Sequence, residues 1–451
     1  MAVAATCILA VVLFIFKRRR TRRHKNRKNM DETETERLYK DEEDRNVSNG
    51  VEVLSRTDGK SLFVHGKFGN SVSSTSHLIL EKFIENNVEW KSLECLYTDI
   101  PENVEENTIM FVYGWFGIWN DDLCSVDKVK KACKELHDIL CKETNVRIVI
   151  GMRTEYHRKY HTHGCFTPSD LFSNELSLDA VNNEKDKEHI KYFMKKIKKP
   201  CKKSECYCHD LKFDNFRDDR DKRIGIPLKM NVLARYHDII NDYVVKRSLL
   251  KAMTNHITTL RRDEKTVVIY QWIMYICLKG QYKRSEELDE ELIKTMEFEI
   301  SGLSFNENEE NLMKYLKFRN SDKQKMVLPE SAQYVFWHPF IYICAFHSLF
   351  TTNPDIAMNY CNIDAILQLV RPENYLDTYL EVHADDAMID LFNQRIQSEG
   401  LQDVCKDHPL IIPSADKGEN IEDVEQSSEG TPSEHGSFTI ISQKAVDMMN
   451  M

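Results

Sequence analysis

The sequence predicts an α/β fold, a parallel sheet with flanking helices that is followed by a mostly helical domain. Two apolar runs, TIMFV at 108–112 and VRIVI at 146–150, are continuous, which is typical of strands buried on both faces. Residues 123–141 lie between them and repeat apolar side chains at helical spacing. Alternation of buried strands with a helix indicates a parallel sheet covered by helices.

The composition is that of a globular protein with room for about two or three domains. The chain has 451 residues, of which 41% are hydrophobic and 30% are charged. Its formal net charge of −10 at pH 7 argues against nucleic acid as a partner. The 13 cysteines are scattered without a paired framework, which is typical of reduced thiols in a cytosolic chain.

The N-terminus combines an apolar segment with a basic one. Residues 2–16 are apolar without interruption, and residues 17–28 contain nine lysines or arginines. Positive charges after the apolar segment predict a transmembrane helix at 1–16 in a single-pass membrane protein, with residues 17–451 cytoplasmic. The basic run would then bind anionic lipid head groups. Because the segment is shorter than the roughly 20 residues that span a bilayer, a truncated start is one alternative, and a cleaved or spurious segment is another. The basic run could instead be a nuclear signal.

Changes in composition divide the rest of the chain. Residues 17–50 are first basic and then acidic and polar, which favours a juxtamembrane linker. Residues 51–228 carry the strand and helix patterns of the sheet domain, and residues 229–400 form the mostly helical domain. Residues 401–451 are polar and turn-rich, which is typical of a disordered tail.

Two apolar segments of the second half predict buried helices rather than further membrane spans. Residues 266–278 are apolar on all sides but too short to cross a bilayer. Residues 334–350 contain His338, Pro339 and His347 and lack a basic flank. We therefore expect both segments to be core helices.

A loop with two glycines is the main candidate for a functional site. The apolar residues 62–64 lead into Gly66 and Gly69, and a helical pattern follows. Strand, glycine turn and helix in that order build a phosphate site, because N–H groups of the turn and of the helix N-terminus point at an anion. Gly66 and Ser73 match the first glycine and the hydroxyl of the P-loop template G-x-x-x-x-G-K-[ST].

Several positions depart from that template. Ser71 stands in place of the second glycine, and Val72 stands in place of the lysine that neutralises phosphate charge. Tyr113 and Gly114 follow the second buried strand, where a working enzyme has acidic residues that hold Mg²⁺ and prepare the attacking water. Because the loop, Tyr113 and Arg153 all fall at strand ends, we expect them at one edge of the sheet.

Over about residues 51–371 the chain resembles the novel STAND NTPase 3 family, a subgroup of the STAND class of P-loop NTPases. The match rests on the loop glycines and Ser73, on an aromatic–glycine pair after the second strand, on Arg153, and on Gly-Ile-Pro-Leu at 225–228. The resemblance implies a P-loop NTPase-like sheet, then a winged-helix and helical domain, with Arg153 as the sensor. It also implies that His338 of the FWHPF run can lie near a nucleotide. A surface ion pair for the arginine and a hydrogen-bonded core position for the histidine are the alternatives.

Together these motifs define a degenerate nucleotide site. Its positions are Gly66, Gly69, Ser71, Val72, Ser73, Tyr113, Gly114 and Arg153. Because the lysine and the acidic pair are absent, we predict no catalytic residue and no cofactor. The favoured function is a signalling or scaffold module without NTP hydrolysis, whose protein partners the sequence does not identify. One alternative is a switch that holds ATP or ADP, with Mg²⁺, through backbone amides without turnover. The other is an active NTPase with displaced catalytic groups.

A cysteine-rich segment suggests a comparison with zinc sites. Cys201, Cys206, Cys208 and His209 have the spacing C-x4-C-x-C-H, which is not a common finger spacing. The adjacent Cys208 and His209 would also strain a shared tetrahedron. We therefore predict reduced thiols in a lysine-rich loop and no metal site. Three further histidines of a polar stretch are expected at the surface: His157, His161 and His163.

Overall fold

The computed structural model describes residues 45–411, with gaps. The gaps are residues 98–99, 114–125, 155–156, 158–160, 162–163, 165–168, 180–190, 192–193, 196, 199–200, 202–205, 320–332, 374, 376–379 and 403–407. The predicted anchor at 1–16, most of the predicted linker and most of the predicted tail lie outside the described residues.

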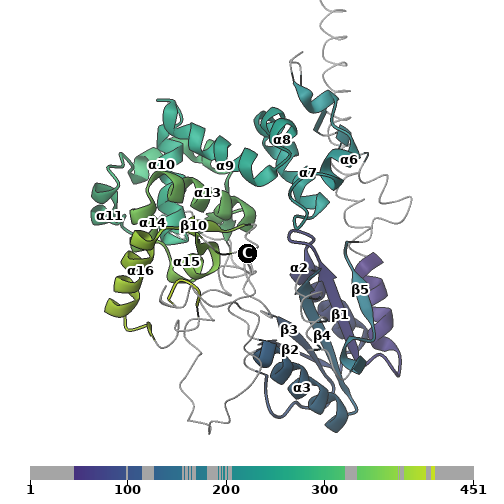
Figure 1. The fold of residues 1–451 in the computed structure, drawn as a ribbon. Helices are drawn as coiled ribbons and strands as arrows, with labels where there is room; N and C mark the ends of the chain where they lie inside the picture. The colour runs from purple at the N-terminus through teal and green to yellow at the C-terminus, as the bar shows by residue number, and fades with distance from the viewer. Residues whose placement is uncertain are drawn as a thin grey trace, which may run out of the picture.

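Five parallel strands form the sheet of the first half, in the order β2-β3-β4-β1-β5 (Figure 1). The strands are β1 (Ser61–Gly66), β2 (Lys91–Leu96), β3 (Thr108–Tyr113), β4 (Val146–Arg153) and β5 (Glu175–Ser177). The helices of this part are α2 (Val72–Asn86), which follows β1, and α3 (Val126–Lys142), which connects β3 to β4. Every strand pairing in this sheet is parallel. The predicted parallel α/β sheet with flanking helices is therefore confirmed.

Each face of the sheet has its own apolar core, because successive strand residues point to opposite faces. Met110 of β3 shares one core with Leu136 of α3. Its neighbour Ile109 shares the other core with Ile79 of α2. Residues 45–55 are also helical, begin within the stretch predicted as a linker, and contribute to the α2 core. The continuous apolar strands are thus explained by helices on both faces.

The second half is mostly helical. Its helices are α6 (Phe213–Arg217), α7 (Ile226–Arg235), α8 (Ile240–Lys246), α9 (Leu249–Thr259), α10 (Val267–Lys279), α11 (Glu290–Thr295), α12 (Gly302–Leu312), α13 (Pro339–Thr352), α14 (Pro354–Tyr360), α15 (Ile363–Leu369) and α16 (Asp386–Ser398). Strands β6 (Tyr282–Lys283), β7 (Leu316–Arg319) and β8 (Gln333–Phe336) form an antiparallel sheet in the order β6-β8-β7. Strands β9 (Val370–Pro372) and β10 (Val382–Ala384) pair in parallel.

Helices α10 and α13 lie at the centre of this helical part. Trp272 and Ile276 of α10 are fully buried, and so are Ile343 and Phe346 of α13. All four belong to one apolar core. The prediction of core helices is confirmed for residues 267–278 and 339–350, whereas residues 334–336 of the second segment belong to strand β8.

The predicted membrane-spanning helix is not supported. In the part of the chain that the structure describes, no helix is both long enough and apolar enough to cross a bilayer. The physical reason is length, since the apolar run at 2–16 falls short of the roughly 20 residues that a span requires. This finding contradicts the transmembrane helix in the predicted fold class and the single-pass location with residues 17–451 cytoplasmic. Neither is retained.

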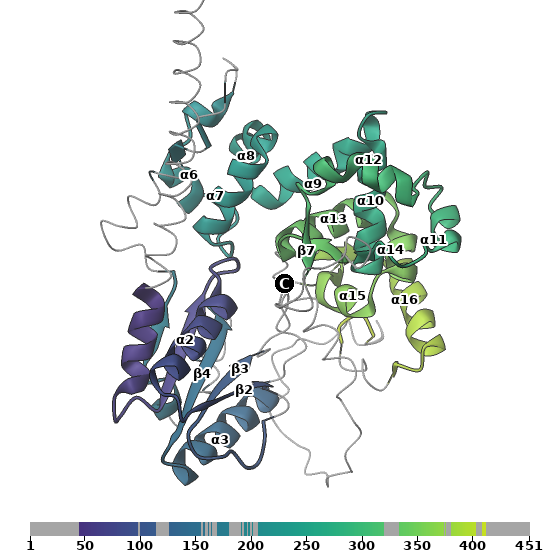
Figure 2. The same cartoon turned by 180° about the vertical axis from the view of Figure 1, so that it is seen from behind.

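The sheet and the helical part lie side by side (Figures 1 and 2). Helices α7 and α8 stand beyond the carboxyl end of β1, and α9 leads from them into the helical core (Figures 1 and 2). The loop that follows β1 therefore faces residues of the second half.

Candidate functional site

The candidate site is the segment of residues 67–71 between β1 and α2, here named the β1–α2 loop. Its backbone adopts left-handed conformations at Gly69, with φ of 87°, and at Ser71, with φ of 57°. Glycine adopts this conformation freely, whereas serine pays a steric cost for it. Ser71 takes the place of the second template glycine and precedes α2 without a side-chain capping hydrogen bond.

Val72 fills the place of the template lysine. Its two γ-carbons lie 3.2 Å and 3.3 Å from the positions that a Cβ would take on Gly66 and Gly151. It is partly buried against the apolar core beneath α2. The side chain therefore occupies the space between the ends of β1 and β4, and it offers a phosphate group neither charge nor donor.

A carboxylate from beyond β5 is bound to the β1–α2 loop. Asp179 Oδ1 accepts hydrogen bonds from the Lys67 backbone N–H at 2.7 Å and from Asn70 Nδ2 at 2.6 Å. Its Oδ2 accepts from Thr154 Oγ1 at 2.6 Å. Hydrogen bonds to an ionised group are short and stronger than neutral ones. The start of the loop is thus held by an anion of the chain itself.

The hydrogen bonds continue from Thr154 into the sheet. His65 Nδ1 lies 3.1 Å from Thr154 Oγ1, and His65 Nε2 lies 2.5 Å from Glu175 Oε1. His65 thus bridges Thr154 and Glu175 through its two ring nitrogens. One chain of hydrogen bonds therefore joins β5, β1 and the end of β4 to the loop.

The loop also pairs with the segment before α7. The Phe68 N–H donates to Arg223 O at 3.1 Å, and the Gly225 N–H donates to Phe68 O at 2.8 Å. A Cβ on Gly69 would stand 2.6 Å from side-chain atoms of Leu228, so only glycine permits this approach. The Gly-Ile-Pro-Leu run therefore closes over the loop through its backbone and through its leucine.

Phe68 is the meeting point of the loop, β4 and the helical part. The guanidinium carbon of Arg153 lies 5.8 Å from the centre of the Phe68 ring. The ring of His338 meets the same ring edge-to-face, with centroids 5.7 Å apart. His338 Nδ1 also accepts from the Phe340 N–H at the start of α13. Burial, with a smaller effect of Lys317, lowers the pKa of His338 to about 4. His338 is therefore a hydrogen-bonded core residue, and its ring also touches the loop at Phe68.

Tyr113 and Gly114 stand where the template has its acidic pair. Tyr113 ends β3, which β4 separates from β1. Its ring lies 5.6 Å from that of Phe111, so it extends the aromatic packing of the sheet. Gly114 lies outside the described residues. Neither Val72 nor Tyr113 supplies a group that neutralises phosphate or binds Mg²⁺.

A buried ion pair holds α7 beneath the segment that pairs with the loop. Lys229 Nζ lies 2.6 Å from Asp219 Oδ1, and these side chains are 2% and 0% exposed. Lys229 also donates to Phe216 O, and Tyr243 donates to Asp219 Oδ2. Burial lowers the pKa of Lys229, and the neighbouring Asp219 opposes that shift. Sequence analysis missed this pair, because lysine and aspartate are ordinarily surface residues.

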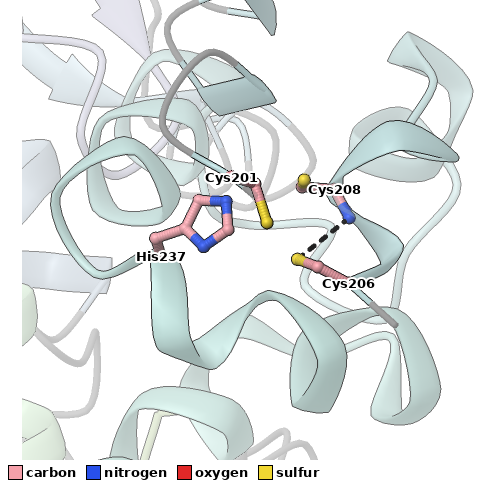
Figure 3. Close-up of side chains that lie close together, drawn as sticks. All are labelled: Cys201, Cys206, Cys208 and His237. Atoms are coloured by element: carbon pink, nitrogen blue, oxygen red, sulfur yellow. Dashed lines mark hydrogen bonds between the residues drawn. The ribbon is translucent and has the colours of Figure 1, made fainter. Parts of the chain in front are cut away.

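Three cysteines and one histidine converge at the other end of α7 (Figure 3). The ligand atoms of Cys201, Cys206, Cys208 and His237 all lie within 4.8 Å of one another. We name these four residues the Cys₃His group. His209, the histidine considered from the sequence, is not in this group, and His237 stands in its place. No local spacing could indicate His237, since it belongs to a separate turn that follows α7.

The other histidines are placed as follows. His161 is exposed, as expected. His157 is partly buried, and its ring lies 4.7 Å from the ring of Phe63 and 5.4 Å from that of His65. His157 is therefore less exposed than expected, because its ring packs against two rings of β1. His163 lies outside the described residues.

Comparisons with known proteins assign the chain to no family. Neither a family model nor a curated protein matches it. One solved structure, that of Drosophila ORC bound to DNA, has a chain with 9% sequence identity and a TM-score of 0.26. The likeness covers 68% of this chain and 86% of that chain, and it is too weak to support any argument. What is established is a unit of strand, loop and helix in a parallel α/β sheet.

Proposed function

We propose that the chain is a STAND-like signalling or scaffold module that does not hydrolyse nucleoside triphosphates and acts through protein partners. The observation that carries this proposal is the packing of Val72 at the lysine position. Phosphoryl transfer depends on positioned positive charge around the transferred group. A valine directed between two strand ends removes that charge and fills part of the space that a lysine stem would need.

The contacts of the β1–α2 loop support the same conclusion. A nucleotide phosphate would have to approach a loop whose first N–H is bound to the carboxylate of Asp179. Like charges at close range repel, and the repulsion is strongest where water is scarce. The backbone of Phe68 is bound to residues 223 and 225 at the same time. The residues present therefore do not fit Mg-ATP or Mg-ADP bound in the manner of a working P-loop enzyme.

The second half supports the STAND-like part of the proposal. Helix α10, strand β6, helices α11 and α12, and strands β7 and β8 follow one another, and the three strands pair antiparallel. This is the element order of a winged helix, the domain that the family resemblance implies. His338 follows the end of β8 by two residues and contacts Phe68 of the loop. This contact supports the proposal, because the resemblance implies a histidine of this region near the loop.

A second candidate is a module that holds ATP or ADP without turnover. The observation in its favour is the start of α2, where Ser71, Ser73 and Ser74 are exposed and no side chain caps the helix. Uncapped N–H groups and the helix dipole attract an anion. Such binding would involve the first turn of α2 and not the lysine position.

Phosphate release from Mg-ATP by the full chain tests the proposal. We expect the wild-type chain to release no more phosphate than buffer does. The matched comparison is the triple variant Val72→Lys, Tyr113→Asp, Gly114→Asp, which restores the template groups. Release by the wild-type chain that disappears in Ser73→Ala would overturn the proposal. Retention of labelled ATP by the wild-type chain without release would instead select the second candidate.

A further inference from the structure

We propose that the Cys₃His group binds one zinc ion as a structural site. Cys201 precedes the 3₁₀ turn η2 (Tyr207–His209), which carries Cys208 and has Cys206 as its N-cap. His237 opens the turn η3 (His237–Ile239), which follows α7. Figure 3 shows the three thiols and the imidazole ring directed at one common space.

The ligand types and their separation fit zinc. Three thiolates and one imidazole in tetrahedral geometry are a common structural zinc set. Bond lengths of about 2.3 Å to sulfur and 2.0–2.1 Å to nitrogen require ligand atoms about 3.5–3.8 Å apart. The four atoms already lie within 4.8 Å of one another, so each needs to move by no more than about 1 Å. Soft thiolates select zinc over magnesium or calcium, which prefer oxygen.

The histidine supplies an independent observation. Nε2 of His237 is buried and has no hydrogen-bond partner among the residues that the structure describes. A buried polar atom without a partner is costly, and native structures rarely leave one in this state. Coordination of a metal ion by this nitrogen would satisfy it.

A disulfide explains the group less well than zinc does. None of the three cysteines forms a disulfide, and Cys206 Sγ accepts a hydrogen bond from the Cys208 N–H at 3.5 Å. A disulfide would leave one thiol and the imidazole unused, whereas a zinc ion uses all four groups. Three thiolates around Zn²⁺ leave the site with one net negative charge. In the sequence, two lysines precede Pro200 and Cys201, at 198–199, and two follow them, at 202–203, so positive charge is close to this site along the chain.

Four protein ligands leave no open position for water or substrate, which indicates a structural role. The ion would tie Cys201 and the turn η2 to the end of α7. The start of α7 is the segment that closes over the β1–α2 loop. Zinc would therefore stabilise the connection between the sheet and the helical part. This inference does not depend on the proposed function.

The first test uses the full wild-type chain. After expression with added zinc, elemental analysis should find one zinc per chain. Replacement by cobalt should give the visible absorption of a tetrahedral site together with sulfur-to-cobalt charge transfer. X-ray absorption at the zinc edge should find three sulfur neighbours and one nitrogen neighbour. A chain that retains no zinc and gives no such cobalt spectrum would overturn the proposal. Because this test needs no substitution, misfolding of a variant cannot obscure it.

The second test identifies the ligands. Cys206→Ser, Cys208→Ser and His237→Ala should each weaken cobalt binding by more than the roughly 10–100-fold that loss of an outer-shell partner costs. His209→Ala and Cys141→Ser are the matched controls and should leave the spectrum unchanged, since Cys141 is an exposed free thiol far along the chain. Loss of binding in His209→Ala with retention in His237→Ala would refute the assigned ligand set. An unchanged spectrum in Cys208→Ser would refute it as well.

Discussion

The β1–α2 loop and the Cys₃His group lie at opposite ends of α7, and in both regions the sequence contains part of a ligand-binding pattern, although we predicted no bound ligand at either. In the loop the groups that would bind the ligand are replaced, and Asp179 and residues 223–225 satisfy the backbone instead. In the Cys₃His group every ligand type is present, and the imidazole nitrogen of His237 has no partner in the described part of the chain.

The difference between the two regions shows that a sequence motif alone does not make a binding site. A glycine loop whose donors are already bound within the chain serves as a structural joint, since a ligand would have to displace those bonds. A ligand cluster that includes a buried nitrogen without a partner in the described part of the chain, His237 Nε2, gains free energy when a further group binds that nitrogen. The state of the polar atoms distinguishes the two regions where their sequence motifs do not.

The largest effect is expected from a change in α7, because that helix supports both regions. Lys229→Met leaves Asp219 buried without its partner and should lower the free energy of unfolding by about 3–5 kcal/mol. Lys82→Met removes an exposed pair with Glu85 on α2 and should cost less than about 0.5 kcal/mol. Urea unfolding measures both. Equal effects of the two substitutions would contradict the importance of the buried pair.

Removal of the metal ion should affect the Cys₃His group and leave the β1–α2 loop unchanged. At a free zinc concentration of about 100–1,000 times Kd, the ion should stabilise the wild-type chain by about 2.7–4.1 kcal/mol. A chelator should therefore lower the melting temperature of the wild-type chain and leave that of His237→Ala unchanged. Identical melting temperatures of the wild-type chain with zinc and with chelator would contradict a stabilising metal.

The substitution Asp179→Asn should weaken the hydrogen bonds of the β1–α2 loop without affecting the Cys₃His group. The amide replaces one acceptor oxygen by a donor that faces existing donors, so we expect a loss of about 2 kcal/mol in urea unfolding. The cobalt spectrum should not change. Asp58→Asn, at an exposed position, is the control and should have no measurable effect. A neutral result for Asp179→Asn would show that the carboxylate does not hold the loop.

The smallest predicted effect concerns pH and the contact of His338 with the loop. Its pKa in the folded chain is about 4, below the ordinary value of about 6.5, because the ring is buried. Between these values the unfolded chain binds the proton more readily, so stability decreases as the pH falls through this window. His338→Asn keeps an acceptor at the start of α13 and removes the titrating ring.

The variant should therefore lose less stability than the wild-type chain, by about 1–2 kcal/mol, between pH 6.5 and pH 5. His347 and His408 keep their own share of the pH dependence, because burial lowers their pKa values too. Parallel stability–pH curves for the two chains would show that His338 is not held neutral by its position.

Local sequence patterns were sufficient for the central strands of the sheet and insufficient for β5 and for the sites. Continuous apolar runs predicted β3 and β4, because strands buried on both faces need apolar residues throughout. The short β5 has no such run, so the sequence did not indicate that Asp179 would meet the loop more than one hundred positions away. The apolar N-terminal run was overvalued, since its composition fits a membrane span and its length does not.

The same limit applies to the Cys₃His group. Cysteine spacing placed three of the ligands in one segment, but the choice between His209 and His237 depends on how α7 folds back on that segment. Tertiary topology also decided the environment of Val72. Its identity argued against a lysine function, and only the fold shows that it fills the space between β1 and β4.

The central claim is that the β1–α2 loop is a structural joint and not a nucleotide site. Thermal unfolding of the full chain with millimolar Mg-ATP or Mg-ADP tests it most directly. Binding at about 100 times Kd would stabilise the chain by about 2.7 kcal/mol, a rise of several degrees in melting temperature. We predict no change with either nucleotide. A rise that Asp179→Asn alters and Asp58→Asn does not would contradict the claim and restore the loop as a nucleotide-binding site.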